Sequence, residues 1–316
     1  MRLSLCVRIV LLTVVSAPAA AAEPPKLNFA PGQTLKYRIE RDLKATTKAL
    51  GETNTTEATI VLDVAATANE PDADGRIKLS VKTTHVKGVA PAFEGLTQRQ
   101  VKFDDRLAAA GAIPGSWHFL SAVAMKKHPL HLVYDPRGTI ADVQGHEALA
   151  AEVDALLGKH FQKHIDFSPT RAIFKQIYSP AVQKALWNDL LIVDLPDNLE
   201  PQKEWKEQRL TYIQPFYVWI EATHLPEKTD DGWKFETTCT MPKSKTASVK
   251  FEIQEFEYSV KNGEGEETVE LDADGTVRRL ESTWHVYFDL TAIALGQRTP
   301  VDELYQRVKY KIERLE

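Results

Sequence analysis

The segment VELDADGTVRRLESTWHVYF, Val269–Phe288, places two runs of alternating apolar and polar residues on either side of a glycine-containing corner. Val269 and Leu271 precede the corner, and from Trp284 onward an apolar residue recurs at every second position. This alternation is typical of half-buried strands, because successive side chains of a strand point to opposite faces. Gly275 accepts the positive φ that a tight hairpin requires. The segment therefore predicts an antiparallel hairpin.

The same pattern recurs along most of the chain. Strand-like alternation occupies residues 34–43, 58–68 and 75–86, and it returns after residue 205. Two further corners are DADGRI (Asp72–Ile77) and YDPRGTI (Tyr134–Ile140). Like the first, each has an aspartate three residues before a glycine. We predict a mainly β protein whose curved antiparallel sheet forms a half-barrel. The matching corners favour two related halves, although few other positions match.

The middle of the chain is predicted to be helical. Apolar residues from 146 to 165 recur at helical spacing. SPTRAIFKQIY and SPAVQKALWNDLL each open with Ser followed by Pro, a helix cap and a first-turn proline. We expect helices over about residues 146–193, packed on the concave side of the sheet, and a shorter helix near FLSAVAM.

The N-terminal segment resembles a cleaved secretory signal. Arg2 and Arg8 are the only charges before a short apolar run, IVLLTVV, which is followed by SAPAAAAEPP. We predict cleavage after Ala22 and a periplasmic or extracellular location; an uncleaved anchor is the alternative. Cys6 precedes the apolar run, so it does not fit a lipid-attachment cysteine.

The remaining chain divides at a short boundary, LPDNLEPQ. We predict a signal peptide at 1–22, a first β half with a helical insert at 23–196 and a second β half at 197–316, in one continuous unit. Loss of the signal would change the formal net charge from −5 to −7. Acids and bases are interspersed, which argues against nucleic acid as a partner. No later apolar stretch is long enough to cross a membrane.

Cys239 would be the single cysteine after signal removal, so no internal disulfide is expected. It shares a strand face with Trp233 and Phe235, which predicts a buried thiol.

Two sets of residues are weak candidates for a metal site. Asp272, Asp274 and Glu281 occupy part of a calcium-loop pattern, but Glu270 stands at its first position and the flanks resemble strands. A hairpin turn explains the corner more simply.

His160 and His164 are one helical turn apart and could chelate zinc. The glutamate that follows the first histidine in metallopeptidases is missing, and no third ligand is evident. Ordinary buried or rim histidines are the simpler interpretation.

Catalytic motifs are absent from the sequence: it contains no nucleophile elbow, no P-loop and no dinucleotide-binding glycine pattern. Ser116 and His118 are neighbours in GSWH, but adjacency in a loop does not make a triad. We therefore expect a non-enzymatic protein without a cofactor.

Four landmarks carry a resemblance to a known family: PGQTLKYRI, LSAVAMKKHPLHLVYDPRGTIADVQGHEAL, LPDNLEPQKEW and VELDADGTVRRLES. Together they resemble exported bacterial proteins, many from Planctomycetes-like genomes, that carry a domain of unknown function. The resemblance implies export, a bacterial host and a curved β fold with helices, and it supplies no catalytic residues. Lys203 departs from the family, where a glycine before the tryptophan is usual.

The predicted layout also has a fold-level analogy with the lipoprotein-carrier half-barrels of bacterial envelopes. Our first hypothesis is an envelope protein that binds a lipid or another hydrophobic molecule between sheet and helices. Both strand parities are kept as pocket candidates, and these are Phe216, Val218, Trp219, Trp233 and Phe235.

Two alternatives stay open. One is a structural or interaction module with a filled core and an unidentified protein partner. The other is a metal-dependent hydrolase that uses His160 and His164.

Overall fold

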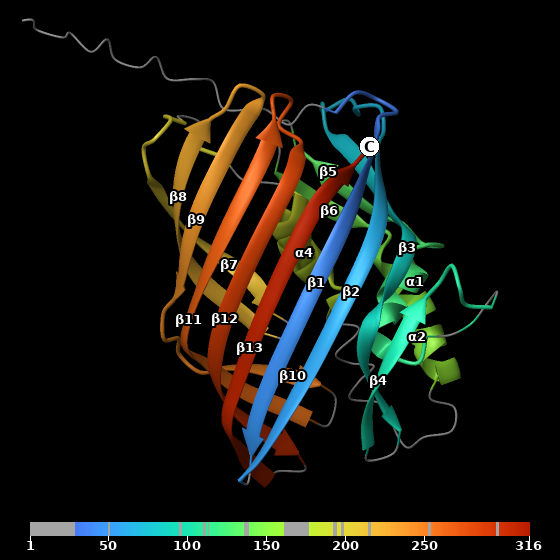
Figure 1. The fold of residues 1–316 in the computed structure, drawn as a ribbon, viewed down its shortest axis with the longest axis vertical. Coiled ribbons are helices and arrows are strands. Elements are labelled where there is room, and N and C mark those ends of the chain that lie inside the picture. The colour runs from blue at the N-terminus through green and yellow to red at the C-terminus, as the bar shows by residue number, and fades with distance from the viewer. Residues whose placement is uncertain are drawn as a thin grey trace, which may run out of the picture.

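The computed structural model describes residues 29–49, 51–94, 97–109, 112, 114–135, 139–160, 177–191, 195–196, 199–213, 216–251, 254–294 and 297–316. Most of these residues belong to one large antiparallel sheet of 13 strands. The sheet is open and curved, and the helices lie behind it in Figure 1. The predicted fold class is confirmed.

The N-terminal part of the sheet follows the order β6-β5-β3-β2-β1. Its strands are β1 (Thr34–Ala49), β2 (Glu52–Ala68), β3 (Ile77–Glu94), β5 (Leu130–Tyr134) and β6 (Ile140–Gln144), with β4 (Thr97–Asp104) paired to β3. The C-terminal part follows the order β12-β11-β9-β8-β7. Its strands are β7 (Trp205–Ile213), β8 (Phe216–Lys228), β9 (Gly232–Met241), β11 (Gln254–Asp272) and β12 (Val277–Ala294), with β10 (Ala247–Phe251) paired to β11.

The two parts repeat one pairing order. The ladder β1-β2-β3-β5-β6 has the same sequence of steps as β7-β8-β9-β11-β12, and every pairing is antiparallel. β13 (Gln297–Leu315) then lies between β12 and β1 and joins the parts into one sheet. The corner that contains Gly275 connects β11 to β12, and YDPRGTI connects the equivalent strands β5 and β6. This repeat accords with two related halves.

Two of the three corners are glycine turns of one type. The Gly275 N–H donates to the Asp272 carbonyl at 2.9 Å, and the Gly75 N–H donates to the Asp72 carbonyl at 3.0 Å. Both glycines have positive φ, 77° and 74°. Residues 136–138 of the third corner lie outside the described residues.

The helices are η1 (Trp117–Phe119), α1 (Leu120–Ala124), α2 (His146–His160) and α4 (Pro180–Leu191). α4 begins as its Ser-Pro start predicts: the Val182 N–H donates to Ser179 Oγ at 3.4 Å. The other Ser-Pro segment lies mostly in residues 161–176, outside the described part. α4 contacts both β6 and β7, the two ends of the strand order. A helix therefore lies between the edges of the open sheet, on its concave side.

The concave face carries several buried apolar clusters. One surrounds Trp233, Phe235 and Leu149, and another contains Phe216, Val218 and the buried Cys239. A third packs η1 and α1 against β2 and β3. Cys239 is buried, as its strand position predicts.

The segment before β7 makes its turn without a glycine. Gln202, rather than Lys203, has the positive φ, 62°. Its N–H donates to the Pro226 carbonyl at 2.7 Å. The departure at Lys203 therefore leaves the turn in place.

Candidate binding cavity

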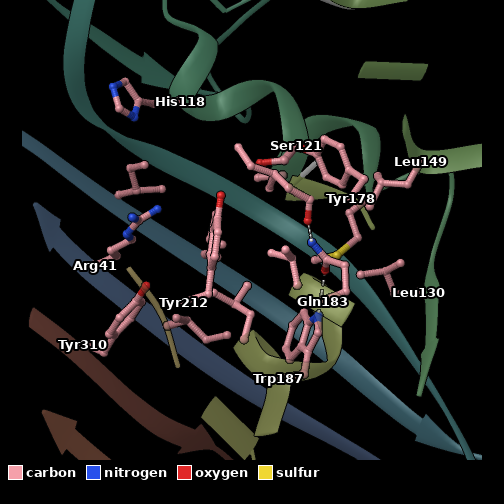
Figure 2. Close-up of a pocket in the computed structure, with 18 residues that line it drawn as sticks. Arg41, His118, Ser121, Leu130, Leu149, Tyr178, Gln183, Trp187, Tyr212 and Tyr310 are labelled. Carbon is pink, nitrogen blue, oxygen red and sulfur yellow. Dashed lines mark hydrogen bonds between the residues drawn. The ribbon is translucent and has the colours of Figure 1, made fainter. Parts of the chain in front are cut away.

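A cavity of about 160 Å³ lies between the concave face of the sheet and the helices. Its sheet side is formed mainly by neighbouring strands at the centre of the strand order, β2, β1 and β13, and Leu130 of β5 and Tyr212 of β7 complete it. The residues from the three central strands are Ile39, Arg41, Ile60, Leu62 and Tyr310. Its helical side comes from η1, α1, α2, α4 and the residues next to α1 and α4 (Figure 2).

Strand register brings the sheet residues together. Arg41 lies opposite Ile60 on β2 and opposite Tyr310 on β13. Because side chains alternate along β1, Ile39 and Arg41 share the concave face. The guanidinium carbon of Arg41 lies 5.8 Å from the centroid of the Tyr310 ring, in cation–π range.

A short hydrogen-bond chain fixes the α4 side. The Gln183 side-chain amide donates to the Ile177 carbonyl at 2.8 Å. Trp187 Nε1 donates to Gln183 Oε1 at 3.2 Å. Both Gln183 and Trp187 are buried. They tie the start of α4 to the preceding residues and shape this wall of the cavity (Figure 2).

The two ends of the cavity differ in chemistry. Arg41, His118 and Tyr310 lie toward one side of Figure 2, and Leu130 and Leu149 lie toward the other. Burial, with the positive charge of Arg41 as the second cause, lowers the pKa of His118 to about 3. At neutral pH Arg41 is therefore the charged member of the polar end.

Tyrosines extend the polar lining of the cavity. Burial raises the pKa of Tyr212, although the nearby Arg41 charge opposes the shift. Burial also raises the pKa of Tyr178. Both phenols therefore keep their protons at neutral pH. The Tyr178 side chain is hydrogen-bonded to Ser121, so Tyr212 is the phenol that can present its O–H group toward a ligand.

The five residues predicted for a pocket lie elsewhere on the sheet. Phe216 and Val218 are buried in one apolar cluster, and Trp233 and Phe235 in another. Trp219 is 57% exposed and points away from both. None of the five is among the described residues that line the cavity.

The calcium-loop carboxylates have protein partners. Asp272 pairs with Arg314, and its second cationic neighbour is Arg278 at 3.8 Å. Asp274 Oδ1 accepts from the Thr276 hydroxyl at 2.7 Å.

Glu281, the third carboxylate of that pattern, lies on β12 and pairs with Arg279 at 2.7 Å. The three acids therefore do not converge on one point. They hold a hairpin turn and its flanks.

The histidine pair is only partly visible. His160 is the last residue of α2, and its side chain lies outside the described residues, as does all of His164. The prediction of a zinc site at this pair stays a prediction.

One other group of side chains has the composition of a metal site. Donor atoms of His85, Asp104 and Asp105 lie within 4.8 Å of one another. His85 Nδ1 lies 2.6 Å from Asp105 Oδ1, and the Lys126 ammonium contacts the other Asp105 oxygen.

Hydrogen bonds already satisfy that carboxylate. Burial alone would raise the pKa of Asp105, but donors from Lys126, His85 and the Val86 backbone outweigh it and lower the pKa. Since Lys126 occupies the place a cation would take, we interpret the group as a buried ion pair.

A second buried polar group lies on the concave face, at β7 to β9. His224 Nδ1 is 2.8 Å from Thr237 Oγ1, and its Nε2 is 3.2 Å from Glu207 Oε1. The imidazole stacks on Trp205 with ring centroids 4.4 Å apart. Despite burial, the His224 contact and the Arg209 charge hold the pKa of Glu207 below its usual value.

Sequence reasoning missed the cavity residues, although one signal was present. In TLKYRIERDL the apolar positions Leu35, Tyr37 and Ile39 are followed on the same face by Arg41. A charged residue at the next inward position is unusual and marks a polar spot in the interior.

None of the described helices is both long and apolar enough to cross a membrane.

Comparisons with known proteins give weak likenesses. No family model and no curated protein sequence matches the chain. Among solved structures, one on lipid–protein interactions in lipovitellin aligns with a TM-score of 0.44 and 9% identity. The alignment covers 92% of this chain and 26% of the lipovitellin chain, so this protein spans about a quarter of that length.

A second solved structure, Pseudomonas aeruginosa OpdQ, aligns with a TM-score of 0.18 and 5% identity, over 90% of this chain and all of that one. Neither likeness is strong enough to carry a functional argument. The function is therefore inferred from the geometry of the cavity.

Proposed function

We propose that this protein is a non-enzymatic binding protein that holds a small hydrophobic molecule between its sheet and its helices. The observation that supports the proposal is the cavity of about 160 Å³ under α1 and α4. An interior built only for stability is close-packed, with few voids larger than a water molecule. A cavity lined mainly by apolar side chains and a few polar groups is typical of a ligand site.

The proposal includes the compartment. The N-terminal segment supports export, and we propose cleavage after Ala22 with release into the periplasm or the extracellular space. The intact mass of the exported protein tests this part, because processing at that bond makes Glu23 the first residue. A retained segment would contradict it.

Native mass spectrometry of the purified protein tests binding. We expect an added mass in the range of a small lipid or similar apolar molecule. The bare polypeptide mass, together with no uptake of an added apolar probe such as 1-octanol, would overturn the proposal.

Filling the cavity provides the matched variant. Ala122 lies on α1, is 4% exposed and lines the cavity. Ala122→Phe should abolish 1-octanol uptake, since the ring would occupy the space of the ligand. Ala148→Phe, at an exposed position of α2, is the control and should bind as the parent does.

A second variant with a smaller side chain keeps the test decisive if Ala122→Phe does not fold. Ser121→Leu enters the cavity from the same helix with a smaller volume change. Unchanged octanol binding in a folded Ser121→Leu protein and in a folded Ala122→Phe protein would rule out this cavity as the site.

A further inference from the structure

The cavity holds a cation that has no anionic partner within the described part of the protein. Arg41 is half-buried on the concave face of β1. Its Nε–H is buried and donates to no acceptor among the described residues. The described residues that line the cavity include no aspartate and no glutamate.

Two other arginines of the sheet are paired with acids. Arg38 Nε lies 2.8 Å from Asp63, and Arg209 lies within 3.8 Å of Glu207 and Glu267. A buried charge without a partner is costly, because the interior solvates it poorly. Arg38 and Arg209 thus have carboxylates within 4 Å, and no ion pair of Arg41 is found among the described residues.

The surroundings of Arg41 suit an anion that arrives with a ligand. His118 is neutral at pH 7, so among the described lining residues the guanidinium of Arg41 supplies the positive charge of the polar end. The Tyr212 hydroxyl is buried and has no hydrogen-bond partner among the described residues. A guanidinium and a hydroxyl donor are suited to bind a carboxylate or a phosphate.

The opposite end of the cavity determines what kind of body the ligand has beyond its head group. Leu130 and Leu149 line it and offer no charge (Figure 2). The cavity of about 160 Å³ leaves room for one short chain or ring beyond the head group. The ligand body is therefore short.

We propose that Arg41 is the head-group site of this cavity and that the ligand is a small amphiphile with a carboxylate or phosphate at one end. The proposal rests on the proposed function and adds the chemical class of the ligand. Arg41 selects the anionic head group, and the leucine end accepts a short aliphatic or aromatic body.

Isothermal titration calorimetry with four eight-carbon probes at pH 7.5 tests the proposal. The probes are octanoate, octyl phosphate, 1-octanol and octylammonium. We expect octanoate or octyl phosphate to bind at least about tenfold more tightly than 1-octanol, because charge-assisted hydrogen bonds are the strong ones. Octylammonium should bind most weakly. The stronger of the two anions identifies the head-group class.

Arg41→Gln should remove the preference for the anion and leave 1-octanol binding within about twofold of the parent. Arg307→Gln is the matched control, since it removes a half-buried arginine from the other face of β13. It should keep the full preference. Loss of the preference in Arg307→Gln to the same extent would overturn a specific role for Arg41.

The outcomes separate this inference from the proposed function. Equal binding of octanoate, octyl phosphate and 1-octanol to the parent would keep the cavity as a site and overturn the head-group assignment. No binding of any probe would overturn both. Arg41→Gln should also unfold at the same or a higher temperature than the parent without ligand, and a clear loss of stability would make Arg41 a structural group instead.

Discussion

His118 lies at the polar end of the cavity, where the protein keeps an imidazole neutral beside a fixed positive charge. Burial is the larger cause of its low pKa, about 3, and the Arg41 charge is the second. An unfolded chain would bind a proton at this residue near the ordinary histidine value of about 6.5. The two values define the pH range in which His118 weakens the fold.

Acid should destabilise the protein through His118. Between about pH 6.5 and 3 the unfolded state binds more protons than the folded state, so the free energy of unfolding rises with pH in this window. We expect His118 to remove about 1–3 kcal/mol of stability between pH 7 and 4, below the limit of about 1.4 kcal/mol per pH unit. Urea unfolding of the parent and of His118→Gln across this range measures the difference.

His128→Gln is the control for this experiment, since His128 has a side chain that is 37% exposed. It should follow the parent curve. If His118→Gln and the parent lost the same stability between pH 7 and 4, His118 would not be neutral in the fold.

At the scale of elements, β9 and β11 approach each other so closely at Gly232 that no side chain fits between their backbones. Gly232 opens β9 and lies opposite Asp272, the last residue of β11. A Cβ at this position would collide with the carbonyl oxygen of Leu271. Glycine is required here by space, while Gly275 in the adjoining corner is required by its positive φ.

Gly232→Ala should lower the free energy of unfolding by about 1–3 kcal/mol, because the backbone must shift to admit the methyl group. Gly115→Ala is the control: its Cβ would meet Val101 at an ordinary 3.7 Å, so we expect little change. Thermal unfolding compares the two. An equal effect of both substitutions would contradict the packing at Gly232.

Local patterns predict the elements of this fold well. Alternation on either side of Gly275 gives β11 and β12, and the Ser-Pro start gives α4. Each signal depends on neighbours in the chain, since strand period, turn glycine and helix cap are local properties. The strand-rich class and the position of the helices follow from them.

The cavity could not be located in the same way. Its sheet side combines Arg41 of β1 with Tyr310 of β13. These residues are distant in the sequence, and only the pairing of β1 with β13 brings them together. Aromatic content pointed instead to Trp233 and Phe235, which fill a close-packed cluster. Composition identifies apolar side chains, but packing decides whether space remains between them.

At the scale of the whole molecule, the pairing of β1 with β13 makes the two halves one body. Ile312 of β13 is fully buried and lies opposite Ile39 on one side and Leu280 on the other. It therefore contacts both halves at their junction. We expect the halves to share one unfolding transition.

Ile312→Ala should destabilise the protein by about 2–5 kcal/mol and keep a single transition. Hydrogen exchange followed by mass spectrometry measures both expectations, because protection should fall together in β2 and in β12. Loss of protection confined to one half would show that the halves unfold independently. Ala294, at the end of β12 and far from Ile39 in the register, can be changed to Gly as a control for strand substitution.

β1 pairs with β13, which the ribosome synthesises later than all the other strands described. A ribosome that adds about 5–20 residues per second needs roughly 10–50 s to go from the start of β1 to the start of β13. During that interval β1 can pair with β2, while the backbone N–H and C=O groups along its other edge remain unpaired. Any similar strand from another nascent chain can occupy that side first. The timing of biosynthesis, as well as the final stability, thus makes this junction the point at which misassembly competes with folding.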